Sequence, residues 1–161
     1  SVLFERTSER VMSMAMVHEQ LHHTDDLSLI PFDRYLADLI EHIRGSSTTD
    51  AVDIRVDCEP ISLEIHRAVP CGLIVNELVM NALQHAFEKD RAGTIEVYLH
   101  RRGERYELGV RDSGAGMPAG VSKSLGMTLV EMLSEQLEAT LEVSPGTDTG
   151  SGTSITLSFP V

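Results

Sequence analysis

Cysteines, long apolar runs and positive charge are all scarce in this sequence of 161 residues. Neither Cys58 nor Cys71 belongs to a CxxC pair or stands beside other metal-binding side chains. Two such thiols in an acidic globular chain are typical of a reducing compartment. The apolar runs, such as Leu73–Val75, are far shorter than the roughly 20 residues of a membrane span. No signal peptide opens the sequence, so we expect a cytoplasmic location and no membrane contact by this segment.

Basic residues are outnumbered by acidic ones. Lys and Arg total 13 against 25 Asp and Glu, a net charge of −12. Such a surface repels a phosphate backbone unless basic residues gather locally. The one basic group, His100–Arg102 with Arg105, falls at the ends of an expected hairpin, so we exclude nucleic acid as a partner. The hydrophobic fraction, 42%, is enough for one core.

The spacing of apolar residues predicts an α+β fold. Apolar residues at threes and fours predict helices at Ser1 to about His23, Asp33 to about Ile43, Val69–Ala86 and Leu125–Leu137. Alternating apolar and polar residues predict strands at Val52–Asp57, Thr94–His100, Arg105–Arg111, Thr140–Val143 and Thr153–Phe159. We therefore expect a two-layer sandwich, with helices on one face of a mixed, mostly antiparallel sheet, preceded by an N-terminal amphipathic helix.

The N-terminal helix has an apolar stripe without a partner in its own segment. The stripe consists of residues spaced by threes and fours: Phe4, Val11, Met14, His18 and Leu21. A stripe of this kind packs against another helix, so we expect a homodimer through the N-terminal helices. We accordingly divide the chain into a helical region, residues 1–30, and a globular domain, residues 31–161.

The same segment contains the pattern HExxH, at His18–His22. In zinc proteases this pattern places two imidazoles and a glutamate on one helix face. No third ligand follows at a recognisable spacing, and short motifs carry a high false-positive risk. We interpret His18 as a packed helix residue.

The central segment Val69–Ala86 is apolar on nearly every side, which is typical of a buried helix. Glu77, Asn81 and His85 are spaced by four, so with Gln84 they form one polar stripe. Carboxylate and carboxamide oxygens suit a hard cation such as Mg²⁺. The stripe indicates a binding site. The alternative is a buried polar network that only fixes packing.

Three glycine-bearing segments stand at the ends of expected elements. They are Asp112–Gly116 after a strand, Ser124–Gly126 at the start of a helix, and Gly150–Thr153 before the last strand. Glycine permits close backbone approach, and a helix N-terminus offers N–H groups to an anion. Together they predict a nucleotide pocket. It is neither a P-loop, since GxxxxGK[ST] is absent, nor a dinucleotide site, since the first glycines read GxGxxxG.

These segments resemble the N, G1, G2 and G3 boxes of the ATP-binding (Bergerat) fold shared by sensor histidine kinases, DNA gyrase, Hsp90 and MutL. The residues that carry the resemblance are Asn76-Glu77-Leu78-Val79-Met80-Asn81-Ala82, Asp112-x-Gly114-x-Gly116, Ser124-Leu125-Gly126 and Gly150-x-Gly152-Thr153. The sequence of the first box and the short lid, Met117–Lys123, are most similar to those of sensor histidine kinases of the HWE and HisKA_2 kind. The segment Arg10–Leu27 resembles the end of their dimerisation helices.

The resemblance implies that ATP and Mg²⁺ are the cofactors. Asn81 would be the Mg²⁺ ligand and Glu77 the polarising base beside the γ-phosphate, with His85 on the same face. Asp112 would accept a hydrogen bond from the adenine amino group, and Thr153 would support the Asp112 end of the pocket.

The remaining cofactor-binding residues follow from the other boxes. Gly114 and Gly116 would let the adenine lie against the backbone. The phosphates would lie under the lid, where Met117 and Lys123 stand, and at the helix start. That start consists of Ser124, Leu125, Gly126 and Met127.

Two departures from the family pattern bear on function. Many of these kinases have a basic residue where this chain has Gln84, which removes a charge from the phosphate end. None of the seven histidines stands in the context of the family's phosphoacceptor, so we expect the acceptor outside this segment. A response regulator receiver domain would be the downstream partner. The alternatives are a catalytically silent partner-binding module, an anti-sigma-type serine kinase, or a gyrase- or Hsp90-like ATPase.

Overall fold

The computed structural model describes residues 7–16, 29–46, 51–86, 92–114, 124–146 and 151–161. Residues 7–16 form a helix. The elements that follow are β1 (Leu29–Pro31), α2 (Phe32–Ser46), β2 (Val52–Cys58), β3 (Ser62–Glu64), α3 (Ile65–Asn81), the π-helical turn η1 (Ala82–Ala86), β4 (Gly93–Arg102), β5 (Arg105–Asp112), α4 (Leu125–Gln136), β6 (Thr140–Ser144) and β7 (Thr153–Pro160).

The main sheet has five strands in the order β2-β4-β5-β7-β6. Only β2 and β4 are parallel, and the other three pairs are antiparallel. The predicted hairpin is confirmed, with Arg102 opposite Arg105 and Gly103 at a positive φ of 63° in the turn. The sheet is mixed and mostly antiparallel, as the alternating patterns predict.

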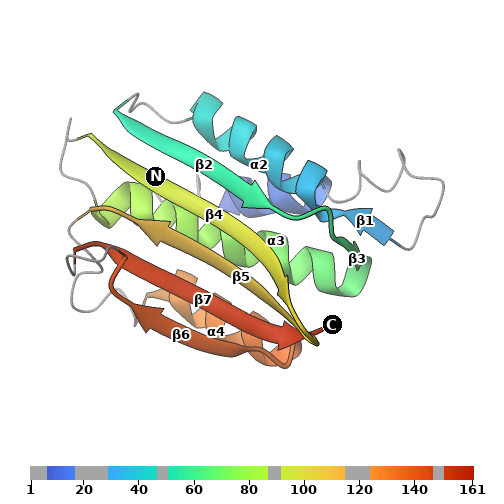
Figure 1. The fold of residues 1–161 in the computed structure, drawn as a ribbon. Helices are drawn as coiled ribbons and strands as arrows, with labels where there is room; N and C mark the ends of the chain where they lie inside the picture. Colours follow the sequence, from blue (N-terminus) through green and yellow to red (C-terminus); the bar gives the residue numbers. More distant parts are fainter. Residues whose placement is uncertain (1–6, 17–28, 47–50, 87–91, 115–123, 147–150) are drawn as a thin grey trace.

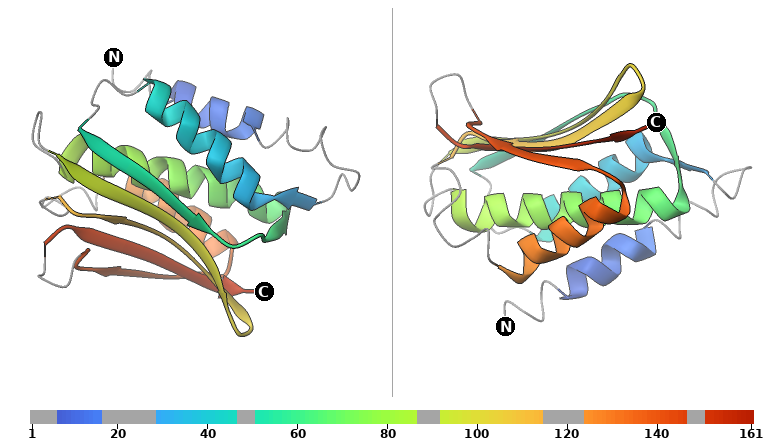
Figure 2. Two further views of the ribbon diagram at one scale, coloured as in Figure 1. Left: turned by 45° about the horizontal axis from the view of Figure 1, so that its top comes forward. Right: turned by 90° about the horizontal axis from the view of Figure 1, so that it is seen from below.

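The helices α2, α3 and α4 cover one face of this sheet (Figure 1). The helix of residues 7–16 lies beyond α3, on the side away from the sheet (Figure 2). The core fills the space between sheet and helices. Inward strand residues such as Val97 and Leu108 are buried with Ile74 and Val79 of α3. No helix among the described residues is long and apolar enough to cross a membrane.

The structure differs from the expected elements in three places. The predicted helix Val69–Ala86 is α-helical only to Asn81 and ends in the π-helical turn η1. Helix α3 begins at Ile65, four residues before the predicted start at Val69, and so it contains Pro70. The prediction placed the proline in the first turn, where its missing N–H costs nothing. Here it stands one turn further in, and the helix starts directly from β3. The short pairing of β1 with β3 was not predicted, because three-residue strands carry too little alternation to recognise.

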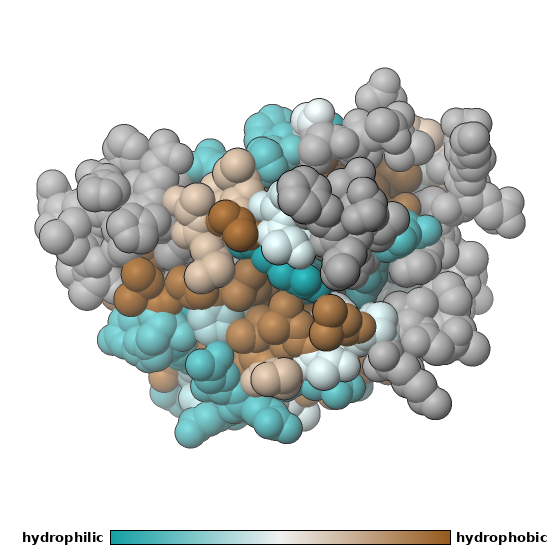
Figure 3. Space-filling view, turned by 180° about the vertical axis from the view of Figure 1, so that it is seen from behind, coloured by the Kyte–Doolittle hydropathy of each residue, from teal (hydrophilic) through white to brown (hydrophobic). Residues whose placement is uncertain are grey.

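The N-terminal helix packs on the domain through a face that is not its apolar stripe. Ser13 is 1% exposed, and its hydroxyl lies 2.6 Å from the hydroxyl of Tyr35 in α2. Val11 and Met14, which belong to the predicted stripe, are 61% and 51% exposed. Apolar residues also gather elsewhere on this helix-bearing side, which Figure 3 shows. The stripe therefore has no partner among the described residues.

Gly72 makes the packing of Tyr35 on α3 possible. A Cβ at Gly72 would fall 2.2 Å from the Tyr35 hydroxyl oxygen, whereas a Cβ at Gly45 in α2 would meet nothing within 4 Å. We expect Gly72→Ala to lower the free energy of unfolding by about 1–3 kcal/mol through overpacking. Gly45→Ala, the matched control, should leave it unchanged or raise it by up to about 1 kcal/mol. Equal urea midpoints for the two variants would contradict this packing.

Candidate functional site

Glu77 and Asn81 occupy successive turns near the end of α3. Glu77 is 1% exposed and Asn81 is 6% exposed, so both residues are buried. Both residues lie on α3, where residues spaced by four are neighbours on one helix face, as the predicted polar stripe requires. Burying such polar groups costs free energy unless they have hydrogen-bond partners. One partner of Glu77 is Arg10, whose Nε donates to Glu77 Oε1 at 2.5 Å.

The polar stripe does not continue regularly beyond Asn81. The π-helical turn η1 follows directly, and its i to i+5 hydrogen bonds change the angular step between residues. Gln84 in this turn is exposed. The side chain of His85 lies outside the described residues, so its place on the stripe stays a prediction. Single π-helical turns are frequent at functional sites.

Asn76 is a further buried polar residue of α3, and the sequence predicts no role for it. It is 1% exposed, and its Oδ1 has no hydrogen-bond partner in the described part of the chain. It precedes Glu77 and stands five residues before Asn81, which puts it on a different helix face. Its motif was recognised, but spacing alone did not show that its side chain is buried.

Asp112 ends β5, with Thr153 of β7 directly opposite. Two hydrogen bonds from described residues reach its carboxylate, both at Oδ1: the backbone N–H of Gly114 donates at 3.0 Å and that of Thr153 at 3.3 Å. Burial raises the pKa of Asp112, and the two N–H groups oppose that rise. Among the described residues, no hydrogen bond reaches Oδ2. A buried carboxylate with one such oxygen suits a donor such as an exocyclic amine.

Two glycines let the last loop approach Asp112 closely. A Cβ at Gly152 would fall 2.0 Å from the backbone oxygen of Asp112, and one at Gly146 would fall 2.2 Å from the same atom. Gly152 also has a positive φ of 75°. The third glycine segment therefore packs against the first, as the predicted pocket requires. Gly146 was missed, because it stands alone in the sequence with no motif around it.

Helix α4 begins at the second predicted glycine segment, where Ser124 is its N-cap. Ser124 Oγ accepts a hydrogen bond from the backbone N–H of Met127 at 3.2 Å. Gly126 and Met127 are buried, whereas the side chain of Leu125 is 66% exposed. The remaining first-turn N–H groups point out of the helix end and can bind an anion. Gly116, Met117 and Lys123 lie outside the described residues.

The end of α3, the end of β5 with Asp112 and the start of β7 lie at one edge of the molecule. In Figure 1, α3 ends, β5 ends and β7 begins on the left-hand side of the sheet. The carboxylate and carboxamide of α3 are thus on the same side of the fold as Asp112. Within the described chain no cluster of three or more His, Cys, Asp or Glu side chains could hold a metal ion. A cation here would instead share few protein ligands with phosphate oxygens, which is the usual mode for Mg²⁺.

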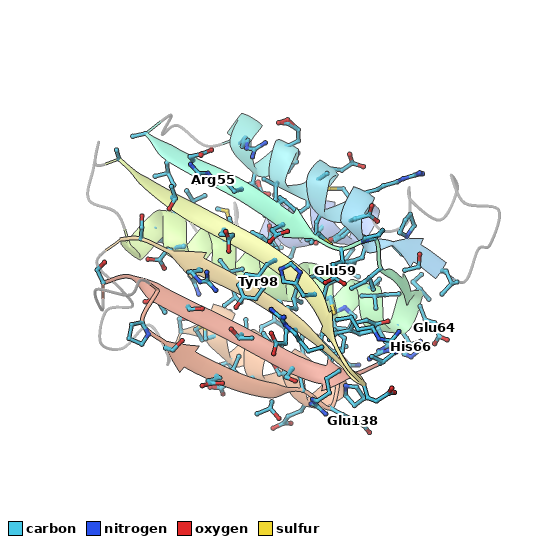
Figure 4. All side chains as sticks on the ribbon, viewed as in Figure 1. Arg55, Glu59, Glu64, His66, Tyr98 and Glu138 are labelled. Atoms are coloured by element: carbon cyan, nitrogen blue, oxygen red, sulfur yellow. The ribbon has the colours of Figure 1, made fainter. Side chains whose placement is uncertain are left out.

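Two surface hollows lie elsewhere. One is on the outer face of the sheet around Tyr98, opposite the face that the helices cover, and the other is lined by Glu64, His66 and Glu138. Figure 4 shows the latter three at the opposite side of the fold, where α3 begins, and Tyr98 on the open face of the sheet. Neither hollow includes a predicted site residue, so we assign no nucleotide to them. The HExxH segment, His18–His22, lies outside the described residues.

Comparison with family models gives two matches. Residues 66–161 match the model described as histidine kinase-, DNA gyrase B- and HSP90-like ATPase. Residues 1–47 match a model described as histidine kinase, HisKA_2. The two matches cover the globular part with the predicted site and the N-terminal helical part, respectively.

Curated relatives and a solved structure agree with these matches. The chain is 29% identical to blue-light-activated histidine kinase 2 of Erythrobacter litoralis, over 98% of this chain and 47% of that protein. It is 29% identical to the sensor histidine kinase PdtaS of Mycobacterium tuberculosis, over 94% of this chain and 31% of that protein. The histidine kinase domain structure of the Erythrobacter litoralis blue-light-activated kinase superposes with a TM-score of 0.86 at 26% identity, covering 97% of this chain and 79% of that one. The chain thus spans less than half the length of these curated relatives.

Proposed function

Because the chain belongs to the family of histidine kinase-, DNA gyrase B- and HSP90-like ATPases, with HisKA_2-type histidine kinase helices at its start, we propose that it is the ATP-binding catalytic part of a two-component sensor histidine kinase. Its reaction would transfer the γ-phosphoryl group of Mg-ATP to a histidine side chain outside residues 1–161. The resemblance of the four sequence boxes and the names of the relatives support this reading.

The observation that carries the proposal is the environment of Asp112. Its carboxylate is buried, and two backbone N–H groups donate to its Oδ1; among the described residues no hydrogen bond reaches Oδ2, which we assign to the ligand. Gly152 brings the neighbouring loop against the same residue. A fixed carboxylate acceptor distinguishes adenine, which carries an amino group, from guanine, which presents a carbonyl oxygen at the corresponding position. A site that bound phosphates alone would not need such a residue.

The residues at this edge fit Mg-ATP by their chemistry. Asn81 would hold Mg²⁺ through its amide oxygen, and the N–H groups at the start of α4 would bind phosphate oxygens. When bound, the metal ion would neutralise charge on the transferred phosphoryl group. Glu77 would orient the acceptor imidazole and accept its proton. Gly116, Met117, Lys123 and His85 remain part of this proposal on the strength of the resemblance.

The partners follow from the same assignment. We propose a homodimer through the N-terminal helices, because the exposed stripe with Val11 and Met14 needs an apolar partner. A response regulator receiver domain would take the phosphoryl group onward. Residues 1–30 would then belong to the dimerisation helices, and residues 31–161 would form the catalytic domain.

Calorimetric titration tests the site. The chain is titrated with a non-hydrolysable ATP analogue, with and without Mg²⁺, and with the matching GTP analogue. We expect binding that prefers adenine and is strengthened by Mg²⁺. Equal affinity for the two bases, or no binding, would contradict the proposed pocket.

A labelling experiment tests the reaction. The chain is incubated with ATP labelled at the γ-phosphate, together with acceptor helices from a HisKA_2 kinase. We expect label on histidine, which is lost in acid and kept in alkali. Label that resists acid would indicate a serine kinase instead. Nucleotide binding without any transfer would favour a silent partner-binding module.

A further inference from the structure

The chain crosses from one strand of the sheet to another beside the predicted adenine site. In the strand order, β7 lies between β6 and β5. Ser144, the last residue of β6, pairs with Ser154 of β7. Two residues later, Gly146 is already close to Asp112 at the end of β5, because a Cβ at Gly146 would fall 2.2 Å from the Asp112 backbone oxygen. The chain that leaves β6 therefore passes the beginning of β7 to reach β5.

This crossing leaves no room for a side chain at Gly146. A Cβ there would also fall 2.8 Å from the backbone nitrogen of Thr153 and 3.1 Å from its backbone oxygen. All three near atoms belong to the backbone, which cannot move aside as the end of a flexible side chain can. Gly146 is buried, although four of the five residues of β6 are exposed. Its φ is not positive, so close packing and not an unusual backbone conformation requires glycine here.

Gly146 contacts the backbone that fixes the Asp112 carboxylate. The Thr153 N–H, whose nitrogen lies close to Gly146, donates to Asp112 Oδ1. On the β4 side, the next residue, Ser113, is tied to Thr94 by two hydrogen bonds. The Ser113 N–H donates to the Thr94 backbone oxygen at 3.0 Å, and Ser113 Oγ accepts from the Thr94 N–H at 2.9 Å. Because the end of β5 is held on that side, a methyl group at position 146 should displace Thr153.

A small displacement of Thr153 is enough to weaken its hydrogen bond to Asp112. The distance from the Thr153 nitrogen to Oδ1 is 3.3 Å, already longer than the usual 2.7–3.2 Å, whereas the Gly114 N–H donates to the same oxygen at 3.0 Å. With both donors in place, the carboxylate is fixed in its rotation about the bond to Cβ. With one donor it can turn, and Oδ2 then leaves its position. Recognition groups need to be held to within about 0.5 Å.

We propose that Gly146 is a positioning residue for adenine recognition. Because it has no side chain, the chain after β6 packs against Asp112 while the Thr153 N–H stays on Oδ1, and Oδ2 is thereby directed at the base. This inference rests on the proposed function, which assigns Oδ2 to the adenine amino group. It places a determinant of the adenine preference outside the four sequence boxes.

Calorimetric titration with a non-hydrolysable ATP analogue and the matching GTP analogue tests this role. For Gly146→Ala we expect about 5- to 30-fold lower affinity for the ATP analogue, because a hydrogen bond to a charged group is weakened but not removed. Affinity for the GTP analogue should stay unchanged. Gly72→Ala is the matched control, since a Cβ at Gly72 would meet the Tyr35 side chain instead. It should lower stability and keep the wild-type preference for adenine.

An NMR titration without nucleotide gives a readout that lower stability alone would not change. In wild type, the amide proton shifts of Gly114 and Thr153 should follow the ionisation of Asp112, because both N–H groups donate to Oδ1. In Gly146→Ala the response of Thr153 should shrink, while that of Gly114 remains. Burial raises the pKa of Asp112 and the N–H groups of Gly114 and Thr153 lower it, so the midpoint should also move to higher pH.

An unchanged Thr153 response in Gly146→Ala would overturn the inference. So would an adenine preference that Gly146→Ala keeps, or that Gly72→Ala loses equally. If Gly146→Ala does not fold, the wild-type protein still decides. A Thr153 amide shift that follows Asp112, with an Overhauser contact between that amide proton and the Gly146 α-protons, supports the inference. The absence of either signal overturns it.

The proposed function fails by a different result. A wild-type chain that binds no adenine nucleotide overturns the ATP site, while the NMR titration still shows whether Gly146 fixes the carboxylate. A wild-type chain that prefers adenine, together with a Gly146→Ala variant that prefers it equally, overturns the role of Gly146 alone.

Discussion

Asp112→Asn is expected to weaken binding of an ATP analogue by about 1.5–3 kcal/mol, the usual range for a hydrogen bond to a charged group. This corresponds to roughly 10- to 150-fold in Kd. The physical reason is that the amide which replaces the carboxylate presents a donor or a weaker acceptor where Oδ2 stood. Calorimetric titration of both proteins measures the difference. The preference for adenine over guanine should shrink by a similar factor.

The same substitution should not destabilise the ligand-free protein. Burial raises the folded-state pKa of Asp112 above its unfolded value, so the folded chain binds more protons than the unfolded chain in that pH window. The charged carboxylate therefore lowers stability once the pH rises above the folded-state pKa. Asparagine removes that penalty, because it is neutral and can still accept from Gly114 and Thr153. The thermal midpoint of Asp112→Asn at neutral pH should equal or exceed that of wild type.

These two expectations together exclude misfolding as the cause of weaker binding. Asp53→Asn is the matched control, since Asp53 has a 58% exposed side chain on β2, which β4 separates from Asp112 on β5. It should change neither affinity nor midpoint by a measurable amount. If Asp112→Asn binds the ATP analogue with wild-type affinity, Asp112 does not recognise adenine. If its thermal midpoint is below that of wild type, the buried carboxylate does not lower stability as we infer.

The main elements of the fold could be predicted from hydrophobic periodicity. The strands of the five-stranded sheet and the helices α2 and α4 alternate or repeat clearly enough to recognise, and their predicted bounds lie close to the observed ones. The start of α3 was displaced, because Pro70 is a strong local signal for a helix start that the tertiary context overrides. The β1–β3 pair is too short for any period to show.

The site residues that could be predicted from the sequence are those that belong to short local motifs. Glu77, Asn81 and Asp112 belong to compact motifs, so their types and order were visible in the sequence. The Arg10–Glu77 pair, the packing of Ser13 on Tyr35 and the close approach of Gly146 to Asp112 join segments far apart in the chain. Such contacts depend on how helices dock and loops close, which spacing within one segment does not encode.

Asn81→Ala is expected to abolish the contribution of Mg²⁺ to nucleotide binding. Mg²⁺ in such sites has few protein ligands besides phosphate oxygens and water, so the loss of one amide oxygen removes most of what the protein supplies. Changes in groups that only support a ligand cost 10- to 100-fold in metal affinity, and loss of the ligand itself should cost about 100-fold or more. Titration with the ATP analogue across a Mg²⁺ series measures the effect.

Two companion variants decide whether Asn81 acts as a ligand or only as a packed residue. Asn81→Asp keeps an oxygen at the same place, so Mg²⁺ should still strengthen binding. Asn76→Ala removes an equally buried asparagine of α3 on a different helix face, so it should lower stability but leave the Mg²⁺ dependence intact. If Asn76→Ala and Asn81→Ala reduce the Mg²⁺ dependence alike, the effect lies in the packing of α3. The cation would then have to be bound by residues other than the Glu77 and Asn81 face.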